Sequence, residues 1–147
     1  MREIAKPVPS DSKWSVFTPR HEKNIYYLII FHMPILKIIT KPNPILRKKS
    51  EEINLKEIKA GDFIKLVSSM EKTMLKTDGA GLAAPQIGKN IRLAVVNSKD
   101  GPICLINPKI IKKSWAKELG QEGCLSIPGI FGQVKRPKKI TLIYCDR

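Results

Sequence analysis

The chain has 147 residues, 42% of them hydrophobic and 27% charged, which allows one hydrophobic core and excludes a disordered or low-complexity protein. Its net charge of +14 comes from 27 Lys and Arg residues that are spread from end to end, without an interleaved row of aromatic residues. The charge therefore predicts a weak attraction to polyanions and no specific nucleic-acid partner.

Residues 1–32 are predicted to be an N-terminal extension outside the domain, which spans residues 33–147. Residues 1–24 are polar and contain three prolines without a periodic pattern. Residues 25–31 are apolar, but a membrane span needs about 20 such residues, and no signal-peptide cleavage site follows. We expect no membrane association, and Met33 could itself be the translation start.

One helix is predicted over roughly residues 60–76. Before it, the prolines at 42 and 44 indicate an extended segment, because proline fixes φ and keeps its predecessor out of the helical region. The helix is indicated by apolar residues at helical spacing, namely Phe63, Leu66, Val67, Met70 and Met74. Asp78-Gly79 marks its end, since glycine accepts the left-handed conformation that closes a helix.

Three strands are predicted in the second half of the chain, at residues 91–96, 103–106 and 140–144. Each is a β-branched run bounded by turn-forming residues. One long helix among several strands, without strand-helix alternation, indicates an α+β fold with mostly antiparallel sheet.

The three cysteines favour a reducing compartment such as the cytoplasm. They are odd in number and none lies close to another, so a disulfide framework is not expected. Cys104 and Cys145 lie in apolar runs and are predicted to be small buried hydrophobic residues. Cys124 lies in a segment of different chemistry.

The first motif covers residues 79–86 and reads G-A-G-L-A-A-P-Q. It follows the helix and is predicted to form a tight loop. Gly79 and Gly81 leave room for a close approach of another backbone, which suits pairing with an extended peptide. Gln86 would offer its side-chain amide to a polarised carbonyl oxygen.

The second motif covers residues 122–126 and reads E-G-C-L-S. Gly123 frees the backbone beside Cys124, whose thiolate is a candidate metal ligand or nucleophile. The backbone N–H of Leu125 is a second candidate donor to an oxyanion. Two such donors are typically worth about 3 to 4 kcal/mol each in a transition state.

With these two motifs, in this order and at this separation, residues 33–147 resemble the peptide deformylases. Asn107-Pro108 and Arg136-Pro137 also match. The family removes the formyl group from the N-terminal methionine of newly made bacterial and organellar proteins. The resemblance therefore implies a deformylase-like fold, a hydrolase and formyl-Met peptides as substrates.

The resemblance also implies a role for each matching residue. Cys124 corresponds to the cysteine ligand of a catalytic Fe(II), or of Zn or Ni in substituted forms. Gln86 and Leu125 correspond to the catalytic oxyanion donors, and Gly79 and Gly81 to the substrate-binding loop. Glu122 corresponds to a structural acidic residue, and Ala80 to a position at the methionine pocket.

One part of the family pattern has no counterpart in these 147 residues. The family takes two further metal ligands and the general base from an H-E-x-x-H helix, whereas the only histidines here are His21 and His32. His21-Glu22 is interpreted as coincidence, since no second histidine follows at the required spacing. We therefore expect a C-terminally incomplete domain that does not bind the metal tightly.

Two hypotheses about function follow from this difference. Either the chain is a catalytically incomplete deformylase, or it binds nascent peptides or the ribosome without catalysis. A third hypothesis, a cysteine-nucleophile hydrolase, lacks anything that places a histidine near Cys124.

Overall fold

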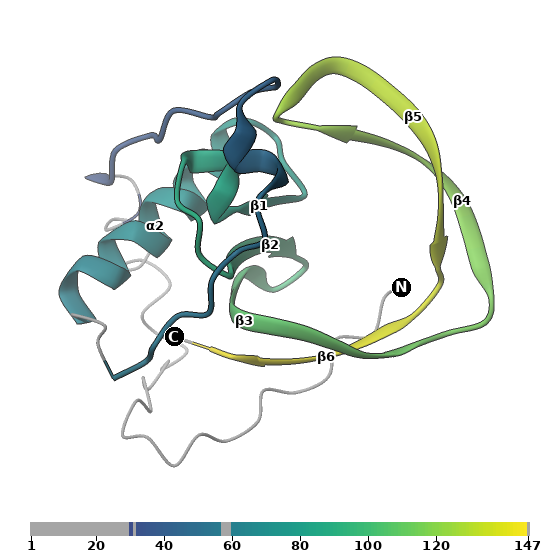
Figure 1. Ribbon diagram of the computed structural model, residues 1–147. Coiled ribbons are helices and arrows are strands. Elements are labelled where there is room, and N and C mark those ends of the chain that lie inside the picture. Colours follow the sequence, from purple (N-terminus) through teal and green to yellow (C-terminus); the bar gives the residue numbers. More distant parts are fainter. Residues whose placement is uncertain (1–29, 31, 57–59, 147) are drawn as a thin grey trace.

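The computed structural model describes residues 30, 32–56 and 60–146, so the N-terminal extension and its His21 lie largely outside the described residues. One long helix, α2 (Ala60–Lys76), packs on a four-stranded sheet with strand order β1-β2-β3-β6. A separate two-stranded ribbon, β4-β5, curves away from that sheet (Figure 1). All pairs of these strands are antiparallel, which confirms the predicted α+β class.

Helix α2 has the predicted bounds and supplies one side of the core. The chain leaves it through Asp78, which has a left-handed φ of 51°, and the Gly79 N–H donates to the Met74 carbonyl at 2.9 Å. This bond satisfies one of the carbonyls that every helix leaves unpaired at its C-terminal end. The helix therefore stops where the first motif begins.

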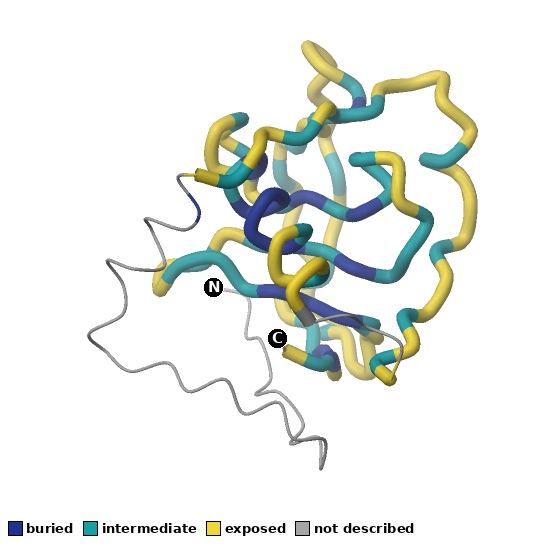
Figure 2. Tube along the Cα trace, turned by 90° about the vertical axis from the view of Figure 1, so that its left-hand side faces the viewer, coloured by how far each residue is buried: buried dark blue, intermediate teal, exposed yellow. Residues whose placement is uncertain are grey.

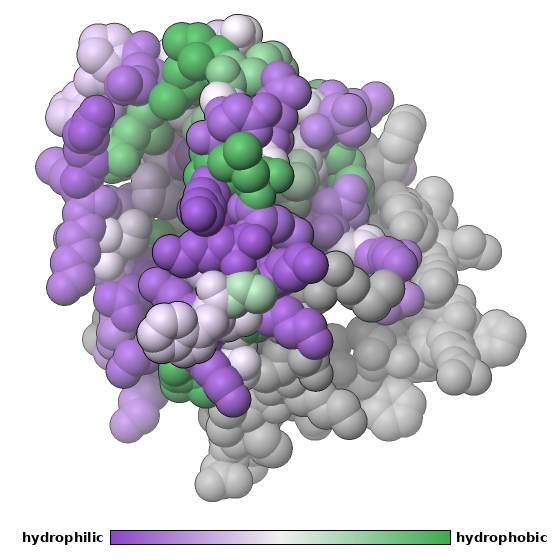
Figure 3. Space-filling model, turned by 90° about the vertical axis from the view of Figure 1, so that its right-hand side faces the viewer, coloured by the Kyte–Doolittle hydropathy of each residue, from purple (hydrophilic) through white to green (hydrophobic). Residues whose placement is uncertain are grey.

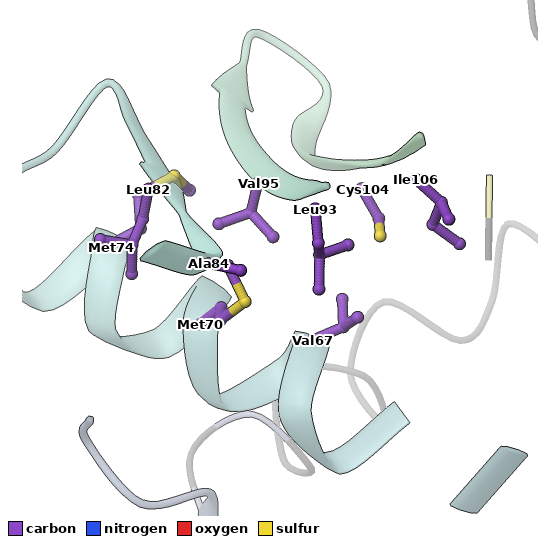
Figure 4. Packing of buried hydrophobic residues seen from close by; sticks show 9 residues of the cluster. All are labelled: Val67, Met70, Met74, Leu82, Ala84, Leu93, Val95, Cys104 and Ile106. Atoms are coloured by element: carbon purple, nitrogen blue, oxygen red, sulfur yellow. The ribbon is translucent and has the colours of Figure 1, made fainter. Parts of the chain in front are cut away.

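The main core lies between α2 and strands β1, β2 and β3. Figure 4 shows its side chains, of which those from the helix point toward those from the sheet. Its buried members are Val67, Met70, Met74, Leu82, Ala84, Leu93, Val95, Cys104 and Ile106. The prediction that Cys104 is buried is thus confirmed, whereas Cys145 is half-buried.

The three predicted strands are present, and one of them is much longer than expected. Strands β2 (Leu93–Ser98) and β6 (Ile140–Cys145) lie within two residues of their predicted positions. Strand β3 (Gly101–Lys113) continues past Pro108, where its register with β6 shifts. A register shift lets a strand pass a proline, which cannot donate to the ladder.

Strand β1 corrects the prediction of a tight loop in the first motif. Gly81–Ala83 form β1, which pairs with β2, and Ala84–Ile87 form a 3-10 turn, η2. Residues 77–80 connect the helix to the strand, and only 79 and 80 of them belong to the motif. The motif is therefore built into the edge of the sheet rather than looped out from it.

Strands β4 (Lys117–Cys124) and β5 (Ile127–Pro137) form the ribbon that the sequence pattern did not predict. Most of the ribbon is exposed, in contrast to the core-facing side of α2 and the buried residues of β2 and β3 (Figure 2). Within the described residues, no helix is long and apolar enough to cross a membrane.

The segment before α2 is fastened to the sheet. A short 3-10 turn, η1 (Pro44–Arg47), is capped by the Asn43 side chain, which accepts from the Ile45 N–H at 3.0 Å. Further on, the Asn107 side chain accepts from the Ile53 N–H and donates to the Ile53 carbonyl, both at 2.9 Å. Asn107 has a left-handed φ of 50°, which asparagine tolerates better than most residues.

Candidate functional site

The two sequence motifs meet at the tip of the ribbon, where β4 turns into β5. Gly79 lies so close to Leu125 that a Cβ at position 79 would come within 3.0 Å of the Leu125 Cδ1 atom. A Cβ on Gly81 would lie 3.1 Å from the Val95 carbonyl oxygen. Both glycines are therefore explained by close approaches: Gly79 lets the second motif pack on the first, and Gly81 lets β1 pair closely with β2.

The Gln86 side chain is held in one orientation beside Cys124. Its Oε1 atom accepts from the Ala83 N–H at 2.8 Å, so its Nε2 atom faces the second motif. There Nε2 donates to the Cys124 Sγ atom at 3.8 Å and to the Ser126 Oγ atom at 3.3 Å. The amide thus presents an N–H donor next to an exposed thiol.

The leading segment, residues 34–41, binds both motifs through its backbone. The Ile39 N–H donates to the Gln86 carbonyl at 2.7 Å, and the Lys41 N–H donates to the Ser126 carbonyl at 3.0 Å. Ser126 is buried, with 3% of its surface exposed. One extended segment therefore fixes the relative positions of Gln86 and the turn that follows Cys124.

The Thr73 side chain of α2 holds the leading segment through a hydrogen bond. Removal of the Thr73 hydroxyl is expected to destabilise this contact. The Leu36 N–H donates to the Thr73 Oγ1 atom at 2.8 Å, and Thr73 is completely buried. Thr73→Val keeps the shape but leaves the Leu36 N–H without its acceptor, so we expect a loss of about 1 to 3 kcal/mol in the free energy of unfolding, measured by urea denaturation.

Thr77→Val is the matched control for Thr73→Val, because the Thr77 hydroxyl bonds only to carbonyls of its own helix, at 2.9 and 3.2 Å. We expect a loss below about 0.5 kcal/mol for this variant. Equal losses in the two variants would contradict the supporting role of Thr73.

Glu122 is paired across the ribbon with Arg136. The Arg136 Nε and Nη2 atoms donate to the two carboxylate oxygens of Glu122, each at 2.8 Å. The hydrogen bonds and the negative charge of Glu122 raise the pKa of Arg136 above its ordinary value, so the guanidinium stays charged. This bidentate pair fixes β4 against β5 two residues before Cys124.

A pocket of about 610 Å³ lies between the ribbon and the sheet. The sheet side contributes Ala80, Ile110, Lys113 and Ile140, and the ribbon contributes Gln121, Glu122, Gly123, Arg136 and Pro137. Ala80 is one of the residues at the wall of this pocket, and its place at a substrate pocket stays a prediction. On the ribbon, the Phe131 ring covers Gly123 so closely that a Cβ there would lie 2.8 Å from it.

The side chains around Cys124 do not form a complete transition-metal site. A catalytic site of this type needs three protein ligands and one open position. Among the residues that the structure describes, no three His, Cys, Asp or Glu side chains lie together as metal ligands would. Of the described side chains at this junction, Cys124 is the one suitable donor, since its neighbour Gln86 offers an N–H rather than a lone pair.

Comparison with known proteins identifies the family. The family model described as "Polypeptide deformylase" matches residues 35–147, most of the chain. The chain belongs to the polypeptide deformylase family. Peptide deformylases of Syntrophomonas wolfei and Caldanaerobacter subterraneus are 46% and 45% identical to it over 115 and 105 residues. These alignments cover 78% and 71% of the chain, and 73% and 64% of the relatives' own length.

Solved deformylase structures share the fold. The peptide deformylase of Thermotoga maritima aligns with a TM-score of 0.72 and 34% identity, over 77% of this chain and 75% of that one. The Ehrlichia chaffeensis enzyme, in complex with actinonin, gives a TM-score of 0.71 and 39% identity over 78% and 70% of the two chains. An Acinetobacter baumannii deformylase with Met-ala-ser bound is similar, with a TM-score of 0.71 and 30% identity over 76% of each chain.

The structure brings together the residues that the sequence singled out and adds three that it missed. Gln86, Cys124 and Leu125 lie at one junction, with Gly79 packed against Leu125. No role was predicted for Ser126, for the Ala83 N–H or for Thr73, although each positions part of this junction. Ser126 could have been found as the last residue of the E-G-C-L-S motif. A backbone donor such as the Ala83 N–H cannot be recognised in this way, because nearly every residue type has a backbone N–H.

Proposed function

We propose that this chain carries the peptide-binding and oxyanion-stabilising part of a deformylase site, which recognises N-terminal formyl-Met peptides in the cytoplasm. We further propose that the 147 residues do not remove the formyl group by themselves. The observation that carries the proposal is the oriented Gln86 amide, whose Nε2 atom lies 3.8 Å from the Cys124 Sγ atom.

The first part of the proposal concerns the substrate peptide. Strand β1 is an edge strand, paired with β2 on one side. An extended peptide can add to such an edge through backbone hydrogen bonds. Gly79 and Gly81 border this edge, and the peptide's N-terminal residue would then lie next to Gln86 and Cys124.

The second part concerns the reacting carbonyl. The Gln86 Nε2 atom, already fixed by the Ala83 N–H, would donate to the formyl oxygen, with the Leu125 N–H as the second donor. Donors that are fixed before the reaction stabilise a developing negative charge without reorganisation. Cys124 supplies a thiolate, but one ligand does not hold a catalytic Fe(II), Zn or Ni ion. The remaining ligands and the general base would have to come from outside these residues.

The test is formate release from formyl-Met-Ala-Ser by the 147-residue chain, with Fe(II) and a reductant in the absence of oxygen. We expect a rate no higher than that of the Cys124→Ala variant or of the protein-free reaction. A deformylase that has the H-E-x-x-H helix serves as the positive control. Robust turnover that disappears in Cys124→Ala would refute the proposed incompleteness.

Peptide binding can be measured separately from formate release, and it tests the β1 edge as the peptide site. A fluorescently labelled formyl-Met-Ala-Ser peptide should bind the chain, and Gly81→Val should weaken binding because its side chain would press on the Val95 carbonyl and displace β1. Gly132→Val on the ribbon is the matched control, since nothing lies within 4 Å of a Cβ there. Equal binding by both variants would argue against the β1 edge as the peptide site.

The non-catalytic hypothesis, docking of the basic surface on the ribosome, stays a prediction. Salt-dependent co-sedimentation of the chain with ribosomes tests it, and absence of co-sedimentation at low salt would count against it.

A further inference from the structure

The chain enters the ribbon from the four-stranded sheet once and returns to the sheet once, and the two crossings lie side by side. Residues 114–116 connect β3 to β4, and residues 138–139 connect β5 to β6. The Ser114 N–H donates to the Lys139 carbonyl at 2.9 Å, and the Lys138 N–H donates to the Ala116 carbonyl at 2.8 Å. The Lys139 N–H also donates to the Ser114 Oγ atom at 3.0 Å. Two segments that are distant in the sequence thus form one ridge.

This ridge is strongly basic. Residues 109–139 contain eight Lys and Arg residues and two acidic residues, so the local charge is positive. One of the two acids, Glu122, is paired with Arg136, and the other, Glu118, lies opposite Arg136 in the β4-β5 register. We define the basic ridge as the exposed residues Lys112, Lys113, Trp115, Lys117, Lys138 and Lys139.

Trp115 stands at the bend of the ridge with 99% of its surface exposed. Tryptophan is highly buried on average, so a bare indole at a strand junction is unusual. Its neighbours in the chain, Ser114 and Ala116, are small, and Lys113 and Lys117 follow on either side. The face formed by β4, β5 and their junction with the sheet is mostly hydrophilic (Figure 3).

We propose that the basic ridge binds single-stranded nucleic acid, with the lysines on the phosphates and an unpaired base stacked on Trp115. Single-strand binding sites combine these two elements, a positively charged surface and an aromatic ring that accepts any base. The ridge presents five exposed lysines and one aromatic ring, which matches a nucleic-acid strand better than a membrane surface. This proposal does not depend on the proposed function.

The ridge also explains why the sequence pattern favoured no nucleic-acid partner. That prediction rested on lysines spread along the chain, without an aromatic residue among them in a continuous stripe. The fold joins residues 112–117 to residues 138–139, which adds Lys138 and Lys139 to the lysines that flank Trp115 in the sequence. The proposed binding is independent of base sequence, and it adds no sequence-specific partner.

Trp115 itself can report binding. The chain has two tryptophans, so a Trp14→Phe background leaves the fluorescence of Trp115 as the signal. The 147-residue chain is titrated at low salt with an unstructured 12-nucleotide RNA and, separately, with the DNA of the same sequence. We expect quenching of Trp115 by stacking and an affinity that falls steeply with salt. The two oligonucleotides distinguish RNA from DNA as the preferred source of the same chemistry.

Two variants separate stacking from charge. Binding by these variants is measured by fluorescence anisotropy of a labelled oligonucleotide. Trp115→Ala should weaken the affinity by about 5- to 100-fold, with little change in its salt dependence. Combined replacement of Lys112, Lys117 and Lys138 by Gln should reduce the slope of log affinity against log salt by about 2, roughly 0.7 for each lost phosphate contact. The matched control replaces three exposed lysines away from the ridge, Lys48, Lys49 and Lys89, and should leave the Trp115 quenching intact.

Three results would overturn the proposal. Trp115→Ala could bind as tightly as the parent chain, which would show that charge accounts for the binding without base stacking. The control lysine variant could lose as much affinity as the ridge variant, which would make the binding diffuse. Vesicles with 30% phosphatidylserine could shift the Trp115 emission where oligonucleotides do not, which would identify a membrane site. Circular dichroism of each variant excludes unfolding as the cause.

Discussion

Met70→Ala is expected to lower the free energy of unfolding by about 2 to 5 kcal/mol. Met70 is completely buried in the centre of the core between α2 and the sheet (Figure 4). Truncation removes its buried apolar atoms and leaves a cavity, because the surrounding close-packed side chains collapse only in part. Urea denaturation followed by circular dichroism measures the loss as a lower midpoint with an unchanged slope.

Ile64→Ala on the same helix is the control for Met70→Ala. Ile64 is 48% exposed, so its truncation removes less buried surface and leaves no enclosed cavity. We expect a loss of less than about 1 kcal/mol. If both variants lost the same amount, α2 would not pack on the sheet through the face that carries Met70.

Asn107→Ala is expected to lower the free energy of unfolding by about 2 to 4 kcal/mol. Two effects add up: the loss of both side-chain hydrogen bonds to Ile53, and the cost of alanine at a φ of 50°. The same urea experiment measures the loss.

Two further substitutions at position 107 separate these effects. Asn107→Gly also loses the hydrogen bonds but accepts the left-handed conformation, so it should be about 1 kcal/mol more stable than Asn107→Ala. Asn107→Asp keeps an acceptor for the Ile53 N–H and should fall between Asn107→Ala and the parent. Equal stability of the Gly and Ala variants would show that backbone strain at Asn107 costs nothing.

Much of the fold could be predicted because its buried elements follow regular patterns. Val67, Met70 and Met74 recur at helical spacing and are all completely buried, so the helix bounds were right. The ribbon could not be predicted in this way. K-E-L-G-Q-E-G-C has no apolar alternation, since both faces of β4 are largely exposed and β4 is held mainly by backbone pairing with β5. Three-residue β1 is too short to show a period of two.

The candidate site was predictable where a motif supplies the side chain and unpredictable where the fold supplies the support. Gln86 and Cys124 were found from the two motifs, and the structure places them in contact across 38 residues of sequence. The amide orientation depends on the Ala83 N–H, and the position of the ribbon tip depends on Lys41. Backbone contacts of this kind arise from chain geometry and can be made by almost any residue type.

The β4-β5 ribbon is bonded to the rest of the domain at both ends, whereas its middle is held mainly by the pairing of β4 with β5. Its tip is held through Ser126, and its base through the bonds between residues 114–116 and 138–139. Opening of the middle of the ribbon and separation of Cys124 from Gln86 are therefore distinct local unfolding events, each with its own free energy. A segment bound in the pocket beneath the ribbon would slow amide exchange in the middle, at Gly120 and Val134, while the spacing of thiol and amide stayed the same. Because Glu122 and Gly123 line the pocket and directly precede Cys124, a change in that spacing would show that pocket occupancy and site geometry are coupled.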